Sequence, residues 1–198
     1  MTSAMSRDLK SAIRARVRAL LAQVSPGEVA EASTQARALL RAQRVWLEAK
    51  SVLFYAPLAF ELDLSPLMTE ALAGGKTVCL PRFVAERADY AAFRVSNPTK
   101  ELIRGSFGIL EPPSHAPPVS LNQLDLALVP GIAFDMGGRR LGRGKGFYDR
   151  LLAAVPGAKC GVAFDQQVVA EIPVEPHDIL MNFTLTPTRW LVFGQSAA

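Results

Sequence analysis

The sequence has few of the residues that form disulfides or bind transition metals: two cysteines and two histidines among 198 residues. Cys79 and Cys160 lie far apart, form no CxxC motif and have no histidine at metal-ligand spacing, which argues against a disulfide framework or a zinc site. Their apolar contexts, TVCLP and KCGVAF, predict reduced core residues. A disulfide or a catalytic thiol is the less favoured alternative.

Long hydrophobic runs are also missing. No stretch approaches the roughly 18 apolar residues that a membrane-spanning helix needs, and the basic N-terminal segment lacks the apolar stretch of a secretory signal. With 49% hydrophobic and 20% charged residues, the composition is typical of a globular protein. We therefore expect a cytoplasmic protein without a membrane partner, folded as a single domain over residues 1–198 with a helical segment at about 6–46 packed on it.

The net charge of +4 is unevenly distributed. Basic residues exceed acidic ones in the first 50 residues and again at 139–150, whereas the remainder of the chain is acidic on balance. Two concentrated regions of positive charge predict a localised anionic ligand rather than a surface for nucleic acid.

Hydrophobic periodicity and helix-start signals predict alternating helices and strands. A first helix is expected from Ser6, a second from the capping box of Ser25 and Glu28 to about Trp46, and a third from Ser65 to Gly74. Expected strands cover residues 51–55, 76–80, 90–95, 124–129, 160–164, 182–186 and 189–193; residues 97–98 are expected to cap a short helix, residues 111–120 to form a loop and residues 146–154 a helix. The strand, helix, strand order predicts an α/β fold with a mostly parallel sheet and helices on both faces.

The segment from Val129 to Leu152, VPGIAFDMGGRRLGRGKGFYDRLL, does not resemble ordinary fold-building sequence. Its glycines alternate with basic residues before a helix-like run, so main-chain N–H groups can approach anionic oxygens beside a helix N-terminus. The spacing fits neither common nucleotide fingerprint, because Gly146 replaces the Ser or Thr of Walker A and Phe147 replaces the third dinucleotide glycine. We predict a phosphate-binding loop of a different design; a flexible, solvated basic loop is the alternative.

A second basic feature lies on the first predicted helix. Lys10, Arg14 and Arg18 are spaced four residues apart, so they form one stripe of like charges that repel one another. An anion bound between them would relieve this repulsion. The alternative is an ordinary solvated helix face.

Together these features resemble the 5-formyltetrahydrofolate cyclo-ligase family, also called methenyltetrahydrofolate synthetases. The matching motifs are Lys10 with Arg14, Glu61 after the first strand, LPR at 80–82, GILEP at 108–112, the central glycine-rich stretch, GVAFDQQ at 161–167 and PHD at 176–178. The resemblance implies a three-layer α/β/α fold of the NagB/RpiA/CoA-transferase-like type. It also implies ATP- and magnesium-dependent closure of 5-formyltetrahydrofolate to 5,10-methenyltetrahydrofolate, with release of ADP and phosphate, through a phosphorylated imidate.

The resemblance also assigns roles to individual residues. ATP-binding roles fall on Lys10, Arg14, Arg140, Leu141, Gly142, Arg143, Gly144, Lys145, Gly146, Phe147 and Tyr148, folate contacts on Tyr55, Ala56, Glu61 and Tyr148, and magnesium ligation on Asp149 and Asp178. We expect Arg143 and Lys145 to neutralise phosphoryl charge and Tyr148 to orient the formyl group. For His177 we expect a supporting role. From the residues alone, the favoured interpretations are a helix first-turn charge for Asp149 and an ordinary loop aspartate for Asp178.

Three positions depart from the family pattern: Leu64 replaces a threonine, Asn182 replaces an aspartate and Phe147 replaces a tyrosine. None removes a phosphate- or metal-binding group, so they bear on substrate affinity rather than on activity. We expect a small-molecule substrate, no nucleic-acid partner and a monomer or weak dimer. The alternatives are a non-catalytic nucleotide- or RNA-binding module on the same fold, and another enzyme on a related sheet, such as a sugar-phosphate isomerase.

Overall fold

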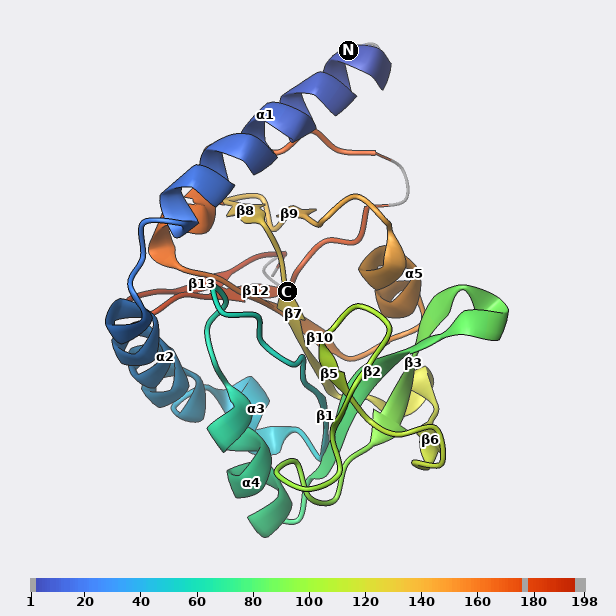
Figure 1. Cartoon of the computed structure of the whole chain (residues 1–198). Helices are drawn as coiled ribbons and strands as arrows, with labels where there is room; N and C mark the ends of the chain where they lie inside the picture. Colours follow the sequence, from blue (N-terminus) through green and yellow to red (C-terminus); the bar gives the residue numbers. More distant parts are fainter. Residues whose placement is uncertain (1–2, 176–177, 195–198) are drawn as a thin grey trace.

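The structure is a computed structural model that describes residues 3–175 and 178–194, and its centre is an eight-stranded sheet (Figure 1). The strand order is β13-β12-β10-β7-β1-β2-β3-β6. Five neighbouring strands run parallel: β12 (Phe183–Leu185), β10 (Ala158–Val162), β7 (Leu126–Pro130), β1 (Ser51–Leu53) and β2 (Thr77–Val84). Antiparallel strands flank them: β13 (Trp190–Val192) on one side, and β3 (Asp89–Arg94) with β6 (Pro118–Val119) on the other. The predicted, largely parallel α/β sheet is confirmed.

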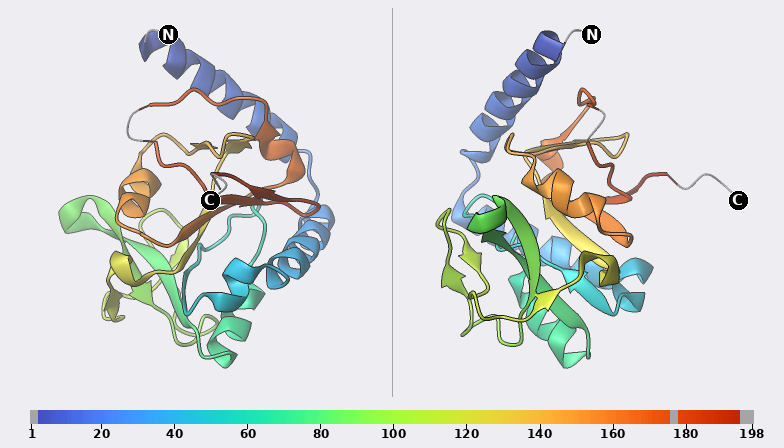
Figure 2. Two further views of the ribbon diagram at one scale, coloured as in Figure 1. Left: turned by 180° about the vertical axis from the view of Figure 1, so that it is seen from behind. Right: turned by 90° about the vertical axis from the view of Figure 1, so that its right-hand side faces the viewer.

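Helices cover both faces of this sheet (Figure 2). They are α1 (Ser3–Leu21), α2 (Pro26–Arg41), α3 (Arg44–Glu48), α4 (Ser65–Ala73) and α5 (Phe147–Ala153). Alternate residues of a strand point to opposite faces, so Val52 packs in the core shared with α1 to α4, whereas Leu53 packs in the core shared with α5. None of the helices in the described ranges combines the length and apolar character needed to cross a membrane.

Smaller strands surround the main sheet. A three-stranded sheet contains β11 (Val168–Val169), β8 (Ala133–Asp135) and β9 (Arg140–Leu141), and a hairpin pairs β4 (Ile103–Arg104) with β5 (Leu110–Glu111). These short strands were not predicted, because two or three residues carry no periodicity of their own.

The second helix begins as predicted and ends earlier. The Ser25 Oγ accepts a hydrogen bond from the Glu28 N–H at 3.3 Å, and the Ser25 N–H donates to the Glu28 carboxylate at 2.8 Å, which completes the capping box. The expected continuation to Trp46 is wrong, because α2 ends at Arg41 and Gln43 is extended. The break starts α3, which packs the Trp46 ring against Phe54 at 6.0 Å.

Three other expectations need correction. The strand predicted to stop at Pro81 continues to Val84 and pairs with β3. Pairing with β1 ends at Cys79, before Pro81. The missing N–H of Pro81 therefore costs no hydrogen bond to β1. The short helix expected at Asn97 is a single turn, in which the Asn97 carbonyl accepts from the Glu101 N–H at 3.0 Å. The first helix begins at Ser3 rather than after Ser6.

Candidate functional site

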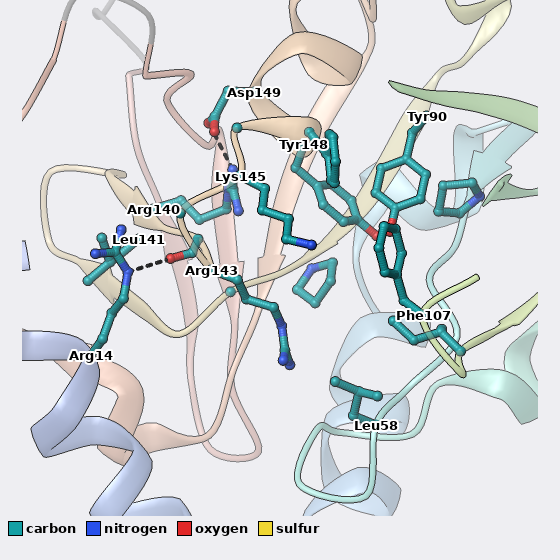
Figure 3. Close-up of a pocket in the computed structure, with 18 of the residues that line it drawn as sticks. Arg14, Leu58, Tyr90, Phe107, Arg140, Leu141, Arg143, Lys145, Tyr148 and Asp149 are labelled. Carbon is teal, nitrogen blue, oxygen red and sulfur yellow. Dashed lines mark hydrogen bonds and ion pairs between the residues drawn. The ribbon is translucent and has the colours of Figure 1, made fainter. Parts of the chain in front are cut away.

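A cavity of about 820 Å³ opens at the carboxyl ends of the parallel strands, where ligands of open α/β sheets bind (Figure 3). Pro130 and Gly131, at the end of β7, form part of its floor. The remaining wall comes from α1, the loop after β1, the β2–β3 and β4–β5 hairpins, the glycine-rich loop and the segment around Asp178.

The cavity brings together almost all of the residues that the sequence singled out. Its lining includes Lys10, Arg14, Ala56, Glu61, Arg140, Leu141, Gly142, Arg143, Gly144, Lys145, Gly146, Phe147, Tyr148, Asp149 and Asp178. Tyr55 does not line it, because the Tyr55 side chain is buried in the core and its hydroxyl donates to the Leu62 carbonyl. His177 lies outside the described residues.

The first helix and the glycine-rich loop meet directly. The Arg14 Nε donates to the Gly142 carbonyl at 2.9 Å, although 128 positions separate them in the sequence. Burial lowers the pKa of the Arg14 guanidinium, and the neighbouring Arg18 lowers it further; arginine nevertheless stays charged at physiological pH. Two basic segments that are distant in sequence therefore form one electropositive wall.

The backbone of the glycine-rich loop prepares the start of α5. Gly146 is the N-cap residue and adopts φ = 67°, a left-handed conformation that strains other residues. No side chain caps this helix within the described residues, so its first-turn N–H groups border the cavity without a side-chain acceptor. This is the arrangement that the sequence predicted for an anion site.

An aromatic wall lies beside the basic residues of the glycine-rich loop. The Phe107 ring lies 5.0 Å from Phe83, and the Tyr90 ring lies 5.3 Å from Phe147 and 5.9 Å from Tyr148. The Lys145 Nζ sits 4.5 Å from the centre of the Phe107 ring, within cation–π range. Tyr90 and Phe107 were not predicted as site residues. The only available signal was the GILEP motif, which follows Phe107 directly.

Glu61 and Tyr148 line the cavity close to this wall. The Glu61 carboxylate accepts from Arg143 at 2.9 Å and from the Leu58 N–H at 3.0 Å, so it joins the loop after β1 to the glycine-rich loop. Burial raises the pKa of the Tyr148 hydroxyl, and the Glu61 carboxylate raises it further. Tyr148 therefore remains a neutral hydrogen-bond donor at physiological pH.

Two aspartates that line the cavity are paired with cations. Asp149 accepts from Arg140 at 2.8 Å, and Asp178 accepts from Lys10 at 2.9 Å. The Arg140 Nε is buried and has no hydrogen-bond partner among the described residues. Within the same part of the chain, no three Asp, Glu, His or Cys side chains gather as a ready-made metal cage.

Two of the three family departures, Leu64 and Asn182, lie away from the cavity lining, whereas Phe147 is part of it. Leu64 is buried in the main core next to α4, and the Asn182 Oδ1 accepts from the Lys159 N–H at 2.8 Å between β10 and β12. Both positions are therefore structural in this chain.

The chain matches a known protein family over most of its length. The family model described as the 5-formyltetrahydrofolate cyclo-ligase family matches residues 6–187. The chain belongs to this family. The 5-formyltetrahydrofolate cyclo-ligase of Escherichia coli K12 is 34% identical, over 89% of this chain and 97% of that protein. The enzyme of the same name from Mycolicibacterium smegmatis is 35% identical, over 76% of this chain and 83% of that protein.

Solved structures agree with this assignment. The structure of Aquifex aeolicus 5,10-methenyltetrahydrofolate synthetase superposes with a TM-score of 0.85 at 34% identity, covering 96% of this chain and 95% of that one. A Mycoplasma pneumoniae 5,10-methenyltetrahydrofolate synthetase gives a TM-score of 0.72 at 19% identity, covering 90% of this chain and 98% of that one. At this identity the likeness supports the shared fold only.

Proposed function

We propose that this member of the family catalyses the ATP- and magnesium-dependent cyclisation of 5-formyltetrahydrofolate to 5,10-methenyltetrahydrofolate, with release of ADP and phosphate. The observation that carries the proposal is the hydrogen bond from Arg14 to Gly142, because it holds the cationic stripe of α1 against the glycine-rich loop beside one cavity. The cyclo-ligase names of relatives that align over most of the chain support the same reaction.

The nucleotide occupies the end of the cavity between α1 and the glycine-rich loop. Lys10 and Arg14 supply positive charge there, and the uncapped N–H groups of α5 supply hydrogen-bond donors. Lys145 lies between this end and the Phe107 ring, where it can reach the transferred phosphoryl group. Phosphoryl transfer needs alignment and charge neutralisation more than covalent help, so this arrangement suits it.

The folate occupies the aromatic end. Phe107 and Tyr90 offer apolar faces for a planar ring, and the Glu61 carboxylate can accept two parallel hydrogen bonds from a pterin amino group and ring N–H. When both substrates bind, Arg143 leaves Glu61 and moves to the nucleotide phosphates. The Arg143 guanidinium then pairs with anionic phosphate oxygens, and the Glu61 carboxylate accepts the pterin N–H donors.

Within this arrangement, the formyl oxygen attacks the γ-phosphorus and ADP leaves, which turns a poor leaving group into a phosphate ester. Tyr148, kept neutral by its raised pKa, donates a hydrogen bond that orients the formyl group. N10 then attacks the formyl carbon and releases its proton to solvent, and phosphate departs as the ring closes. Arg143 and Lys145 stabilise the charge that develops on the transferred group.

The donor set also suits magnesium. Asp149 and Asp178 both line the cavity and offer oxygen ligands only, and Mg²⁺ is commonly held by one or two carboxylates with water and substrate phosphates. These two aspartates would hold the ion, which would supply charge neutralisation for the phosphates. In exchange, Arg140 and Lys10 would become available to the nucleotide.

Formation of the methenyl product from 5-formyltetrahydrofolate, followed by its absorbance in the presence of Mg-ATP, tests the proposal. Pure, folded protein should turn over only when ATP, magnesium and the formyl folate are all present. Absence of turnover under those conditions would contradict the proposed function.

A further inference from the structure

Asp135, at the end of β8, is a buried carboxylate with no direct contact to the cavity. It is 1% exposed and does not belong to the cavity lining. Its Oδ1 accepts from the Gly137 N–H at 2.9 Å and from the Arg139 N–H at 3.0 Å. Its Oδ2 accepts from the Ile172 N–H at 2.8 Å and from the Arg139 guanidinium at 3.4 Å. A buried charge with this many donors stabilises a specific backbone geometry.

The turn that Asp135 closes leads directly into the site. Because the Arg139 N–H is held, the path of the chain into Arg140 is fixed where β9 begins. Arg140 then pairs with Asp149 at 2.8 Å. One half of the carboxylate therefore sets the position of the glycine-rich loop.

The same turn also holds both ends of the segment that carries Asp178. At one end, Ile172 donates to Asp135, and at the other, the Met181 N–H donates to the Gly138 carbonyl at 2.7 Å. The first part of this segment, residues 172–175, runs beside α1 (Figures 1 and 2), and Asp178 pairs with Lys10 of the same helix at 2.9 Å. Gly138 adopts φ = 76°, and a Cβ there would come within 2.8 Å of the Met181 carbonyl oxygen.

We propose that Asp135 is a positioning residue that sets the distance between the glycine-rich loop and the Asp178 segment, and so sets the affinity of the site for Mg-ATP. The inference rests on the proposed function. Asp135 acts through the backbone at Arg139 and Ile172, and its removal loosens both walls of the phosphate end together. The folate end depends mainly on Glu61, Tyr90 and Phe107, which this turn does not hold.

Asp135→Asn tests this proposal with little change in shape. The neutral amide keeps one oxygen, so its NH₂ group faces backbone N–H donors on one of the two sides. We expect the dissociation constant for Mg-ATP, measured by calorimetry, to rise about tenfold or more, as typically follows the loss of a supporting contact behind a binding site. The KM for Mg-ATP should rise in parallel, and the KM for 5-formyltetrahydrofolate should change less than about twofold.

Asp125→Asn is the matched control, because the Asp125 Oδ2 also accepts backbone N–H groups, from Lys50 at 2.8 Å and Ser51 at 2.9 Å, at the opposite end of the sheet. It should lower thermal stability and leave Mg-ATP affinity unchanged. Gly138→Ala is a second variant, which displaces the Met181 end of the segment and should show the same selective loss for Mg-ATP if Asp135→Asn does not fold.

The results distinguish a failure of the Asp135 inference from a failure of the proposed function. If wild-type protein turns over and Asp135→Asn changes both KM values equally, or neither, or matches Asp125→Asn, then Asp135 is only a structural residue and the inference is wrong. If wild-type protein does not turn over, the proposed function fails instead, and the calorimetric comparison of Mg-ATP binding still decides the role of Asp135.

Discussion

Arg143 and Glu61 form an ion pair at 2.9 Å that joins the glycine-rich loop to the loop after β1. The Glu61 side chain is mostly buried, at 11% exposure, whereas that of Arg143 is 46% exposed. Glu61 is therefore the fixed member of the pair, also held by the Leu58 N–H, and Arg143 is the member that can move to a ligand.

Replacing Glu61 with Gln should weaken folate binding selectively. The amide retains the shape and loses the charge that accepts two pterin donors, so we expect the KM for 5-formyltetrahydrofolate to rise at least about tenfold, with a smaller change for ATP. Steady-state kinetics with each substrate varied in turn measure this. Glu48→Gln is the control, because Glu48 is exposed on α3 and pairs only with Arg44 in the described structure; equal effects of the two variants would contradict the assignment.

Replacing Lys145 with Ala should reduce kcat/KM for Mg-ATP by about 100-fold, the cost of losing one donor that stabilises transferred charge. Lys145 is exposed, and no carboxylate of the described chain lies within ion-pair distance of its Nζ, which instead contacts the Phe107 ring at 4.5 Å. The folded state should therefore be unaffected. Lys100→Ala, at an exposed position outside the cavity lining, should behave like wild type. Unchanged kinetics of the Lys145 variant would remove the loop from the mechanism.

Tyr148 should act in its neutral form across an unusually wide pH range. Its pKa is raised above the ordinary value by burial first and by Glu61 second, and a raised pKa keeps the hydroxyl protonated as the pH increases. The kcat of the wild type should therefore show no loss from tyrosine ionisation up to about pH 10. Tyr148→Phe should lower kcat at least about tenfold at every pH. An alkaline limb near pH 9 that disappears in this variant would show that Tyr148 titrates normally.

The buried thiol of Cys79 should make stability fall at high pH. Burial raises its pKa to about 12 from an ordinary 9.0. Below pH 9 the thiol is neutral in both folded and unfolded chains, so its contribution is complete; between pH 9 and 12 only the unfolded chain ionises, and the free energy of unfolding decreases by up to about 1.4 kcal/mol per pH unit. Denaturant unfolding at several pH values measures this slope. Cys79→Ala should have a shallower slope, and identical slopes would contradict the prediction.

The sequence predicted the elements that local patterns specify. The alternation of glycine with Arg143 and Lys145, the stripe of Lys10 and Arg14, and the capping box at Ser25 each follow from residue type and spacing. Arg14 meeting Gly142 confirms that the two basic segments converge, which neither segment specifies alone.

The remainder of the site depends on tertiary contacts. The β4–β5 hairpin that carries Phe107 has two-residue strands, and Glu111 attaches it to β2 through Arg82 at 3.3 Å, so no local pattern predicts it. The expected folate contact at Tyr55 failed for a related reason. The alternation of residues along the predicted strand does not tell on which face of the sheet the Tyr55 ring lies. In the structure the ring is buried in the core.

A crystal structure with Mg²⁺ and a non-hydrolysable ATP analogue tests most directly whether two distant basic segments bind one triphosphate. We predict phosphate oxygens within hydrogen-bond distance of Lys10, Arg14 and the main-chain N–H groups of residues 142–148, with Mg²⁺ on Asp149 or Asp178. A nucleotide bound elsewhere, or one that contacts the glycine-rich loop with no contact to α1, would contradict that claim.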